Sequence, residues 1–412
     1  MTGCRLLPLL MLVLAGAAGA ETSPYYIGVS QAFSHNTNLL GLPDDAATPA
    51  GFSKSDTTSS TSLLAGLDQP IGRQHLFGDV ALRYNRMAHN DIYSNTSYSL
   101  AGGLDWSTIN RISGSVNLKI DRSLASFYTV QIGFLTKKNV QTTGQFDAAV
   151  RAGVNSLWTT EATLGLHRVD YSAEEYEGRE FRQTVGSLGA KYHPSAASTF
   201  GIAVRDSSGR YPKFRQLLDG SVQADEFTRQ DLDFTARLLP TGATTLNARL
   251  SFSHTRYDIA TQRDFSGITG RLGWDWQPTG KLHFKTELIR EPGQESYFLS
   301  VFVPDATVDY SRIATSLRWR GDYQLDAKIA LNTTMVLTRS SLTRTVELTG
   351  LPGNQDTGSE SRSNFAIGAT WTPLRSVQLG CDLGRQQRSG TPPLSSDLHA
   401  TTYSCYGQLT LQ

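Results

Sequence analysis

Cysteine is scarce in this chain, with three residues in 412. Cys4 lies ahead of an apolar N-terminal segment, so only Cys381 and Cys405 remain for the folded part. Two cysteines exclude a small domain held together by a disulfide framework. An excess of one charge is also missing, because 38 Lys and Arg residues are matched by 37 Asp and Glu residues. This balance argues against a nucleic-acid partner.

Long apolar runs are absent beyond residue 20, and a membrane helix requires roughly 20 such residues. The N-terminus differs, because Arg5 precedes the apolar stretch 6–16 and the small-residue triplet Ala18-Gly19-Ala20. This order predicts a cleaved secretory signal peptide over residues 1–20, which removes Cys4, and a mature chain over 21–412.

Two-residue alternation is what the sequence has in abundance. In LNARLSFS (246–253), apolar Leu, Ala, Leu and Phe alternate with Asn, Arg and Ser. Successive side chains of a strand point to opposite faces, so this pattern predicts a strand with one apolar and one polar face. In QLDAKIALNTTMVLT (324–338) the alternation lasts about fifteen residues, whereas strands of soluble sheets typically have five or six. No helical period competes over a long window.

Short and long connections alternate between the predicted strands. The short ones include Gly321–Asp322, and the long ones include 207–224, 292–307 and 340–358. Counting between them gives about eighteen strands, with sixteen as the alternative, and no proline interrupts a predicted strand. This arrangement predicts an all-β, antiparallel, up-and-down transmembrane barrel over residues 21–412, with the short turns on the periplasmic side.

Tryptophan has a restricted distribution. All six residues lie within a short connection or a few residues ahead of one, as expected for an aromatic girdle at a membrane–water interface. In a soluble β-sandwich or propeller, which is the alternative fold, they would be spread through the core. The predicted interface aromatics are Trp106, Trp158, Trp274, Trp276, Trp319 and Trp371.

Charged residues on the polar parity are predicted to face the lumen. They form either a conduit that guides a hydrated, anionic glycan or the ordinary wall of a water-filled barrel, with charges paired across strands. The lumen-facing candidates are Arg111, Arg249, Arg271, Arg312, Arg318, Arg320, Asp326 and Lys328.

Other candidate features are few. Cys381 and Cys405 share the apolar parity of the last two strands, which makes them a candidate disulfide. Segment 295–304, ESYFLSVFVP, is expected to extend a hairpin, with an inward constriction as the alternative. The acidic stretch 170–180 matches no metal loop, and the eight histidines show neither metal-ligand nor triad spacing. No metal, cofactor or catalytic residue is therefore predicted.

Several stretches resemble outer-membrane barrel proteins of exosortase-associated exopolysaccharide loci, the EpsL type. They are YYIGVSQAFSHNTNLLGLP (25–43), SDTTSSTSLLAGLDQPIGRQHL (55–76), RISGSVNLKIDRSLASF (111–127), KNVQTTGQFDAAVRAGV (138–154) and VDYSAEEYEGREFRQTVGSLGAKYHPS (169–195). The resemblance implies a non-enzymatic outer-membrane component of extracellular polysaccharide export or assembly. It implies no catalytic residues.

The expected location is the bacterial outer membrane. Expected partners are outer-membrane lipid and lipopolysaccharide, the barrel assembly machinery, periplasmic export proteins and, from the resemblance, the polysaccharide. A general diffusion porin and a surface barrel that anchors finished polysaccharide are the alternative functions, because fold alone does not determine function.

Overall fold

The computed structural model of the protein describes residues 23–109, 111–129, 133–154, 156–217, 219–298, 307–347 and 354–412. The predicted signal peptide, with Cys4, lies outside these ranges. Among the residues described, no helix is long and apolar enough to cross a membrane.

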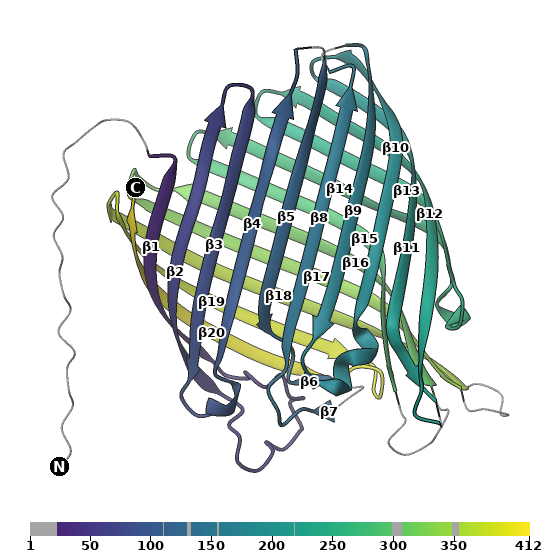
Figure 1. The fold of residues 1–412 in the computed structure, drawn as a ribbon. Coiled ribbons are helices and arrows are strands. Elements are labelled where there is room, and N and C mark those ends of the chain that lie inside the picture. Colours follow the sequence, from purple (N-terminus) through teal and green to yellow (C-terminus); the bar gives the residue numbers. More distant parts are fainter. Residues whose placement is uncertain are drawn as a thin grey trace.

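Within these ranges, eighteen antiparallel strands form one closed barrel, which confirms the predicted fold class. Each strand pairs with the next one along the barrel, and β1 pairs with β20 from Ile27–Leu411 to Asn36–Thr402 to close it (Figure 1). Closure leaves no sheet edge exposed. The strands are β1 (Tyr25–Asn36), β2 (Asp56–Ile71), β3 (Gln74–Met87), β4 (Asn95–Ser107), β5 (Ile112–Leu124), β8 (Val140–Ala152), β9 (Trp158–Tyr171), β10 (Phe181–Ser195), β11 (Ser198–Gln216), β12 (Val222–Thr241), β13 (Thr244–Tyr257), β14 (Phe265–Thr279), β15 (Leu282–Phe298), β16 (Thr307–Gln324), β17 (Ile329–Glu347), β18 (Asn354–Leu374), β19 (Val377–Gly390) and β20 (Leu398–Leu411).

The two ends of the barrel differ. Short turns gather at the end that also holds the start of β1 and the end of β20, at the top of Figure 1, and longer loops gather at the other end. We call these the turn end and the loop end. Four strand pairs shift register just before a short turn, and each shift contains a proline, which cannot donate to the ladder. These prolines are Pro194, Pro240, Pro278 and Pro373.

Several predicted long loops are instead strand. β11 continues to Gln216 and β12 begins at Val222, so the predicted loop 207–224 is mostly a hairpin. The β15–β16 and β17–β18 hairpins likewise extend into predicted loops 292–307 and 340–358. The extension of ESYFLSVFVP is present through Phe298, and residues 299–306 lie outside the described ranges.

These extensions also show that the proline prediction was wrong. Pro212 lies within β11, inside a register shift between Tyr211 and Arg215. Pro292 lies within β15, two residues beyond Arg290, where the pairing of β15 with β14 stops. A proline lacks the N–H that a ladder on both sides requires, and both positions lie where pairing is interrupted.

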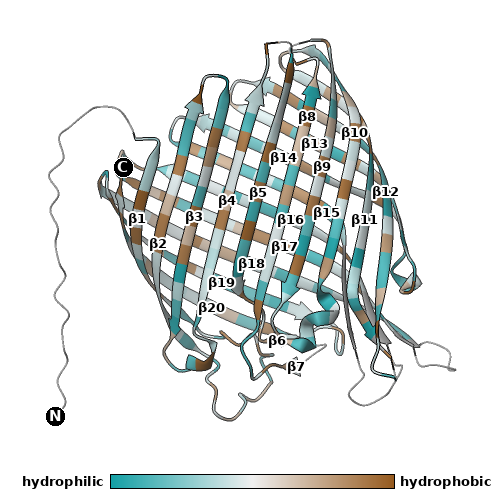
Figure 2. Cartoon of the chain, viewed as in Figure 1, coloured by the Kyte–Doolittle hydropathy of each residue, from teal (hydrophilic) through white to brown (hydrophobic). Residues whose placement is uncertain are grey.

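The barrel has a continuous apolar outer face. Hydrophobic and hydrophilic residues alternate along the strands in Figure 2, and the apolar rows are exposed rather than packed. Such rows occur on strands throughout the barrel, for example Leu164 and Leu166 on β9, Ile202 and Val204 on β11, Leu250 and Phe252 on β13, and Ile367 on β18. An uncovered apolar surface of this extent requires an apolar solvent.

Small elements occupy the loop end. The 3-10 helices η1 (Asp91–Tyr93), η2 (Glu174–Arg179) and η3 (Thr261–Arg263) lie in loops, and β6 (Tyr128–Thr129) pairs with β7 (Gly133–Phe134).

Candidate functional site

The polar parity of the strands lines the inside of the barrel. Arg249 on β13 reaches Glu291 on β15, with its Nη2 3.3 Å from the carboxylate Oε1. β14 lies between these two strands in the sheet, so their side chains meet only across the concave side. The row that contains Arg249 is therefore the inner row, and the apolar row opposite it faces outward.

A buried ion-pair network covers the inner face of β11–β13. The Arg205 guanidinium lies 3.2 Å from Asp231 and 2.9 Å from Asp233, and Arg229 lies 2.9 Å from Asp231. Both aspartates are almost fully buried. Their negative charges are compensated locally, so this part of the wall is a packed polar layer.

The lumen narrows beside this network. β11 and β15 approach each other with Cα atoms within 8 Å, although three strands separate them in the sheet. η2 lies within the same distance of β9, β11 and β15. The loop of η2, residues 172–180, is therefore folded inward and contacts two walls.

The β13–β14 hairpin also bends inward at the loop end. β13 pairs with β14 up to Thr255–Phe265, whereas β14 pairs with β15 only up to Gly270–Arg290. Freed from β15, the hairpin tip carries η3 to within 8 Å of β16 in Cα distance.

Arg263, at this tip, is fully buried among aromatic rings. Its guanidinium carbon lies 5.7 Å from the ring centroid of Tyr211, 5.2 Å from that of Phe214 and 5.8 Å from that of Tyr257. A cation over several aromatic faces is attracted by their quadrupoles, more strongly when desolvated. Arg263 therefore attaches the hairpin tip to the loop end of β11.

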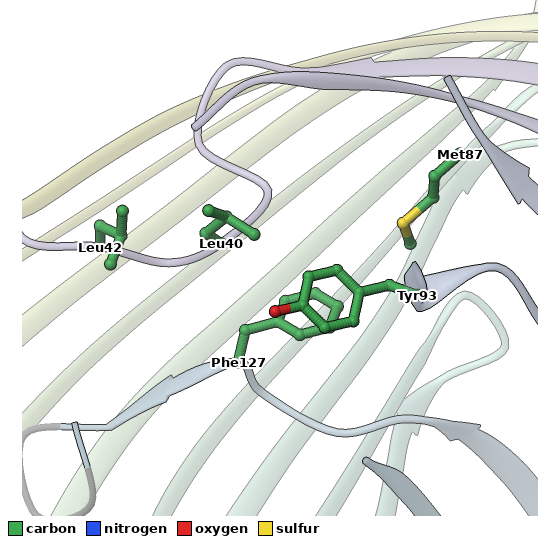
Figure 3. Close-up of a cluster of buried hydrophobic side chains, with 5 residues drawn as sticks. All are labelled: Leu40, Leu42, Met87, Tyr93 and Phe127. Atoms are coloured by element: carbon green, nitrogen blue, oxygen red, sulfur yellow. The ribbon is translucent and has the colours of Figure 1, made fainter. Parts of the chain in front are cut away.

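The loop of η2 and other loops at this end pack into a second assembly. We call the segments 37–55, 88–94, 125–139 and 172–180 the loop cluster; residues 130–132 are outside the described ranges. Its core contains Leu40, Leu42, Met87, Tyr93 and Phe127 (Figure 3). The Tyr93 hydroxyl donates to the Leu135 carbonyl at 2.7 Å, and burial raises the pKa of Tyr93 to about 12. Because these loops share a hydrophobic core, they pack as one unit and are not separate, solvated segments.

Buried amide and carboxylate groups join these loops to one another. Asp56, at the loop end of β2, accepts hydrogen bonds from the backbone N–H groups of Thr57, Ala88, His89 and Asn90. Burial would raise the pKa of Asp56, but these backbone hydrogen bonds dominate and hold it below its usual value. In the same way, Asn139 accepts from the Ala173 N–H at 3.1 Å and links two further loops.

Five of the predicted lumen residues lie on the inner row. Arg312 is 3.9 Å from Glu360, and Arg320 is 2.8 Å from Asp322. Arg271 and Arg318 have no ion pair with any residue that the structure describes, although Arg318 is directly opposite Glu287 in the register. The structure does not gather the five into one cluster, because they spread from β13 to β16. They are Arg249, Arg271, Arg312, Arg318 and Arg320.

Three predicted lumen residues occupy turns instead. Arg111 precedes β5 and has a φ of 64°, a turn conformation. The turn that was predicted at Gly321–Asp322 falls at 325–328, so Asp326 and Lys328 leave the strand. The Asp326 carboxylate accepts the backbone N–H groups of Lys328 and Ile329 at 2.7 and 2.8 Å, which stabilises the turn.

The tryptophans lie near the turn end, as their sequence positions imply. Trp274 and Trp276 stack on the outer row of β14 with ring centroids 5.5 Å apart. The stack continues through Phe284 to Trp319, at 5.5 and 5.8 Å. The ring centroids of Trp158 and Tyr192 are 4.9 Å apart. Trp106 is the penultimate residue of β4, and Trp371 lies near the end of β18.

Cys381 and Cys405 are joined by a disulfide in the structure. They are directly opposite each other in the β19–β20 register, on the outer row. The acidic stretch 170–180 forms no metal site: within the described ranges no group of three or more His, Cys, Asp or Glu side chains is placed to hold a metal ion.

Sequence reasoning missed Arg263 and Asp56. Arg263 ends the three-residue 3-10 helix TQR, and nothing local distinguishes it from a solvated arginine. Asp56 had a weak signal, since an Asp directly before a Thr/Ser-rich strand commonly accepts backbone N–H groups at a strand start.

No protein-family model matches the sequence, and no curated protein matches it. Among solved structures, the ferric enterobactin receptor PfeA of Pseudomonas aeruginosa is similar over 96% of this chain and 82% of its own, with 9% identity and a TM-score of 0.46. The outer membrane protein OpdK of the same species is similar over 94% and 98%, with 14% identity and a TM-score of 0.44. The FrpB iron transporter of Neisseria meningitidis is similar over 95% and 82%, with 8% identity and a TM-score of 0.44. These values are too low to carry any inference about function.

Proposed function

We propose that this protein is an outer-membrane channel for hydrated, anionic solutes whose loop end is closed by its own loops. The observation that carries the proposal is the contrast between its two faces. The outer row is apolar and exposed on strands all round the closed barrel, whereas the inner row carries ion pairs and arginines that have no ion pair with a described residue. Water-filled barrels in outer membranes have this distribution.

The preference for anions rests on the inner row of β14 and β16. Arg271 is directly opposite Arg249, and Arg318 is two residues from Arg320 on the same strand; neither Arg271 nor Arg318 has a carboxylate in ion-pair contact among the described residues. A cation whose charge is not compensated attracts anions to a water-filled wall.

Passage requires movement at the loop end. The loop cluster has its own hydrophobic core, and η2 and the β13–β14 tip both extend inward. The contacts that hold these elements include those of Tyr93, Asp56 and Arg263. Loops attached in this way open at lower free energy than the strands of the wall.

For the solute, we propose an extracellular polysaccharide with acidic groups, as the resemblance to EpsL-type barrels implies. The lumen then guides the chain without covalent chemistry, and periplasmic export proteins deliver it at the turn end. A general diffusion porin remains the second candidate, since a polar wall also admits small solutes. A barrel that anchors finished polysaccharide at its loops is the third.

Two measurements separate these functions. Reconstituted in planar bilayers, the wild-type protein is expected to show small, infrequent conductance steps, and a variant that lacks 174–179 is expected to conduct more. Equal conductance of both would contradict closure by η2. In cells, a deletion strain that secretes normal amounts of polysaccharide would exclude export; normal attachment of that polysaccharide to the cell would then favour the porin, and its release would favour the anchoring barrel.

A further inference from the structure

The outer face of β9–β11 carries three arginines side by side at the loop end. Arg182 on β10 is directly opposite Arg168 on β9 and directly opposite Arg210 on β11. All three side chains are exposed and belong to the outward row, since the residues that alternate with them, such as Val169 and Gly209, are buried. We call these three residues the arginine row.

Like charges directly opposite in a sheet repel each other, so a row of three requires compensation. Arg168 is paired with Asp170 through bonds of 2.5 and 2.8 Å, and Arg210 lies 3.4 Å from Glu226. Arg182, between them, has no ion pair within the part of the chain that the structure describes. The centre of the row is therefore an exposed cation flanked by two partly compensated ones.

The height of the row on the barrel is informative. Each of the three arginines is ten residues along its strand from an aromatic residue near the turn end: Trp158, Tyr192 and Phe200. At about 3.3 Å per residue and a tilt of about 40°, ten residues span about 25 Å. That is the height of the apolar band of an outer-membrane barrel, so the row lies at the level of the outer-leaflet headgroups.

We propose that the arginine row binds the phosphate groups of a phosphorylated glycolipid in the outer leaflet, of the lipopolysaccharide type. Guanidinium groups hold phosphate through paired N–H donors, and three adjacent forks suit a headgroup with more than one phosphate. Below the row, the exposed side chains Leu166, Leu188 and Val204 provide an apolar surface for the acyl chains.

This inference rests on the proposed membrane location but not on the proposed transport. A channel that fails to conduct still binds the lipid if the row acts as described. Conversely, loss of lipid binding leaves the conductance of the lumen untouched.

The test uses the full barrel in phosphatidylcholine vesicles that contain a bisphosphorylated lipid A, its dephosphorylated form, or phosphatidylglycerol. Retained lipid is quantified by native mass spectrometry after extraction into mild detergent. The triple variant R168Q/R182Q/R210Q is compared with R312Q/R318Q/R320Q, which makes the same change of net charge on the inner row. Heat-modifiable migration on gels verifies that each variant is folded.

We expect the wild type and the inner-row variant to retain bisphosphorylated lipid A at least about tenfold better than the outer-row variant, a difference of about 1.4 kcal/mol. Equal retention by both variants would overturn the proposal. Equal retention of the dephosphorylated lipid or of phosphatidylglycerol would overturn the assignment to clustered phosphates. Displacement of the lipid by millimolar inorganic phosphate would show that the row is a site for free phosphate instead.

If the triple variant does not fold, the single variants R182Q and R182K provide the test. R182Q removes the central positive charge, whereas R182K keeps the charge but lacks the planar guanidinium. The ion pairs of Arg168 and Arg210 stay intact in both variants. Retention that falls in R182Q and is partly restored in R182K supports the proposal. Retention that is unchanged in R182Q contradicts it.

Discussion

The carboxylate of Asp56 accepts two hydrogen bonds from Asn90, from its backbone N–H at 2.8 Å and from its side-chain amide at 2.9 Å. Asn90 in turn pairs with the backbone of Ser53, accepting at 2.9 Å and donating at 2.9 Å. These two residues therefore join the loops that follow β1 and β3 to the loop end of β2. The closed arrangement of the loop cluster depends on a carboxylate as well as on its hydrophobic core.

Replacing Asp56 with Asn is expected to loosen this junction. The amide presents a donor where backbone N–H groups require an acceptor, which costs about 1–3 kcal/mol for buried unsatisfied groups. Hydrogen exchange at Ala88, His89 and Asn90 should accelerate by about tenfold for each 1.4 kcal/mol lost. D91N is the control, because Asp91 is exposed and its carboxylate bonds, among the residues that the structure describes, to Ser94 of its own turn alone. Equal exchange in both variants would contradict the role of Asp56.

The same carboxylate predicts a pH dependence. Its pKa in the folded protein lies below the unfolded value, so its stabilising effect is complete above about pH 4 and is lost as the pH falls through the folded pKa. Limited digestion with pepsin should therefore reach the apolar residues of the loop cluster faster as the pH falls below about 4. In D56N this rise in the digestion rate below about pH 4 should be missing, because the amide does not titrate. A rise of the same size in D56N would show that another group controls the loops.

Tyr93 allows packing and hydrogen bonding to be separated. Tyr93→Phe keeps the ring beside Phe52 and Phe127 but loses the bond to Leu135, at a cost of about 1 kcal/mol. Tyr93→Ala also leaves a cavity, and the cost rises to about 3–5 kcal/mol. The rate of amide hydrogen exchange in the loop cluster should be lowest in the wild type, higher in Tyr93→Phe and highest in Tyr93→Ala. The exchange rates of the strands should not change. Identical exchange in the Ala variant would show that the cluster does not depend on this ring.

The architecture was predictable because the same alternation of outward and inward side chains recurs on every strand of a closed barrel. One parity contacts an apolar environment and the other does not, so Leu250 and Arg249 could be assigned to opposite faces from local sequence. Strand count followed from the turns, and four of the short turns are marked by prolines that occupy register shifts near the strand ends.

Strand ends and inward loops were not predictable in the same way. Beyond the apolar band both faces are polar, so alternation fades, and strands such as β11 and β17 were assigned too short. Asp326 shows the opposite error, because an apolar alternation passed through a turn held by its carboxylate. Arg263 is buried among rings that include Tyr211 and Phe214 of β11, which are distant from it in the sequence. Such contacts depend on tertiary packing and leave no local pattern.

The disulfide between Cys381 and Cys405 is expected to stabilise the last hairpin. It closes a loop of 24 residues, for which loop-closure entropy gives about 2–4 kcal/mol. Reducing agent should lower the temperature at which the barrel loses its compact migration on gels. The variant C381S/C405S should lose it at the temperature of the reduced protein, with or without reducing agent. A wild-type melting temperature that does not respond to full reduction would contradict this role.

Arg318 is the residue at which ion selectivity should respond most clearly. It lies on the inner row of β16 without an ion pair among the described residues, so Arg318→Glu replaces an uncompensated cation by an anion beside Glu287. The anion-to-cation permeability ratio should fall by about threefold or more, measured from reversal potentials in a salt gradient. R339E is the matched control, because Arg339 makes the same charge change on the opposite parity of β17, which faces outward. Its ratio should stay at the wild-type value, and an equal fall in both variants would show that selectivity is set outside the lumen.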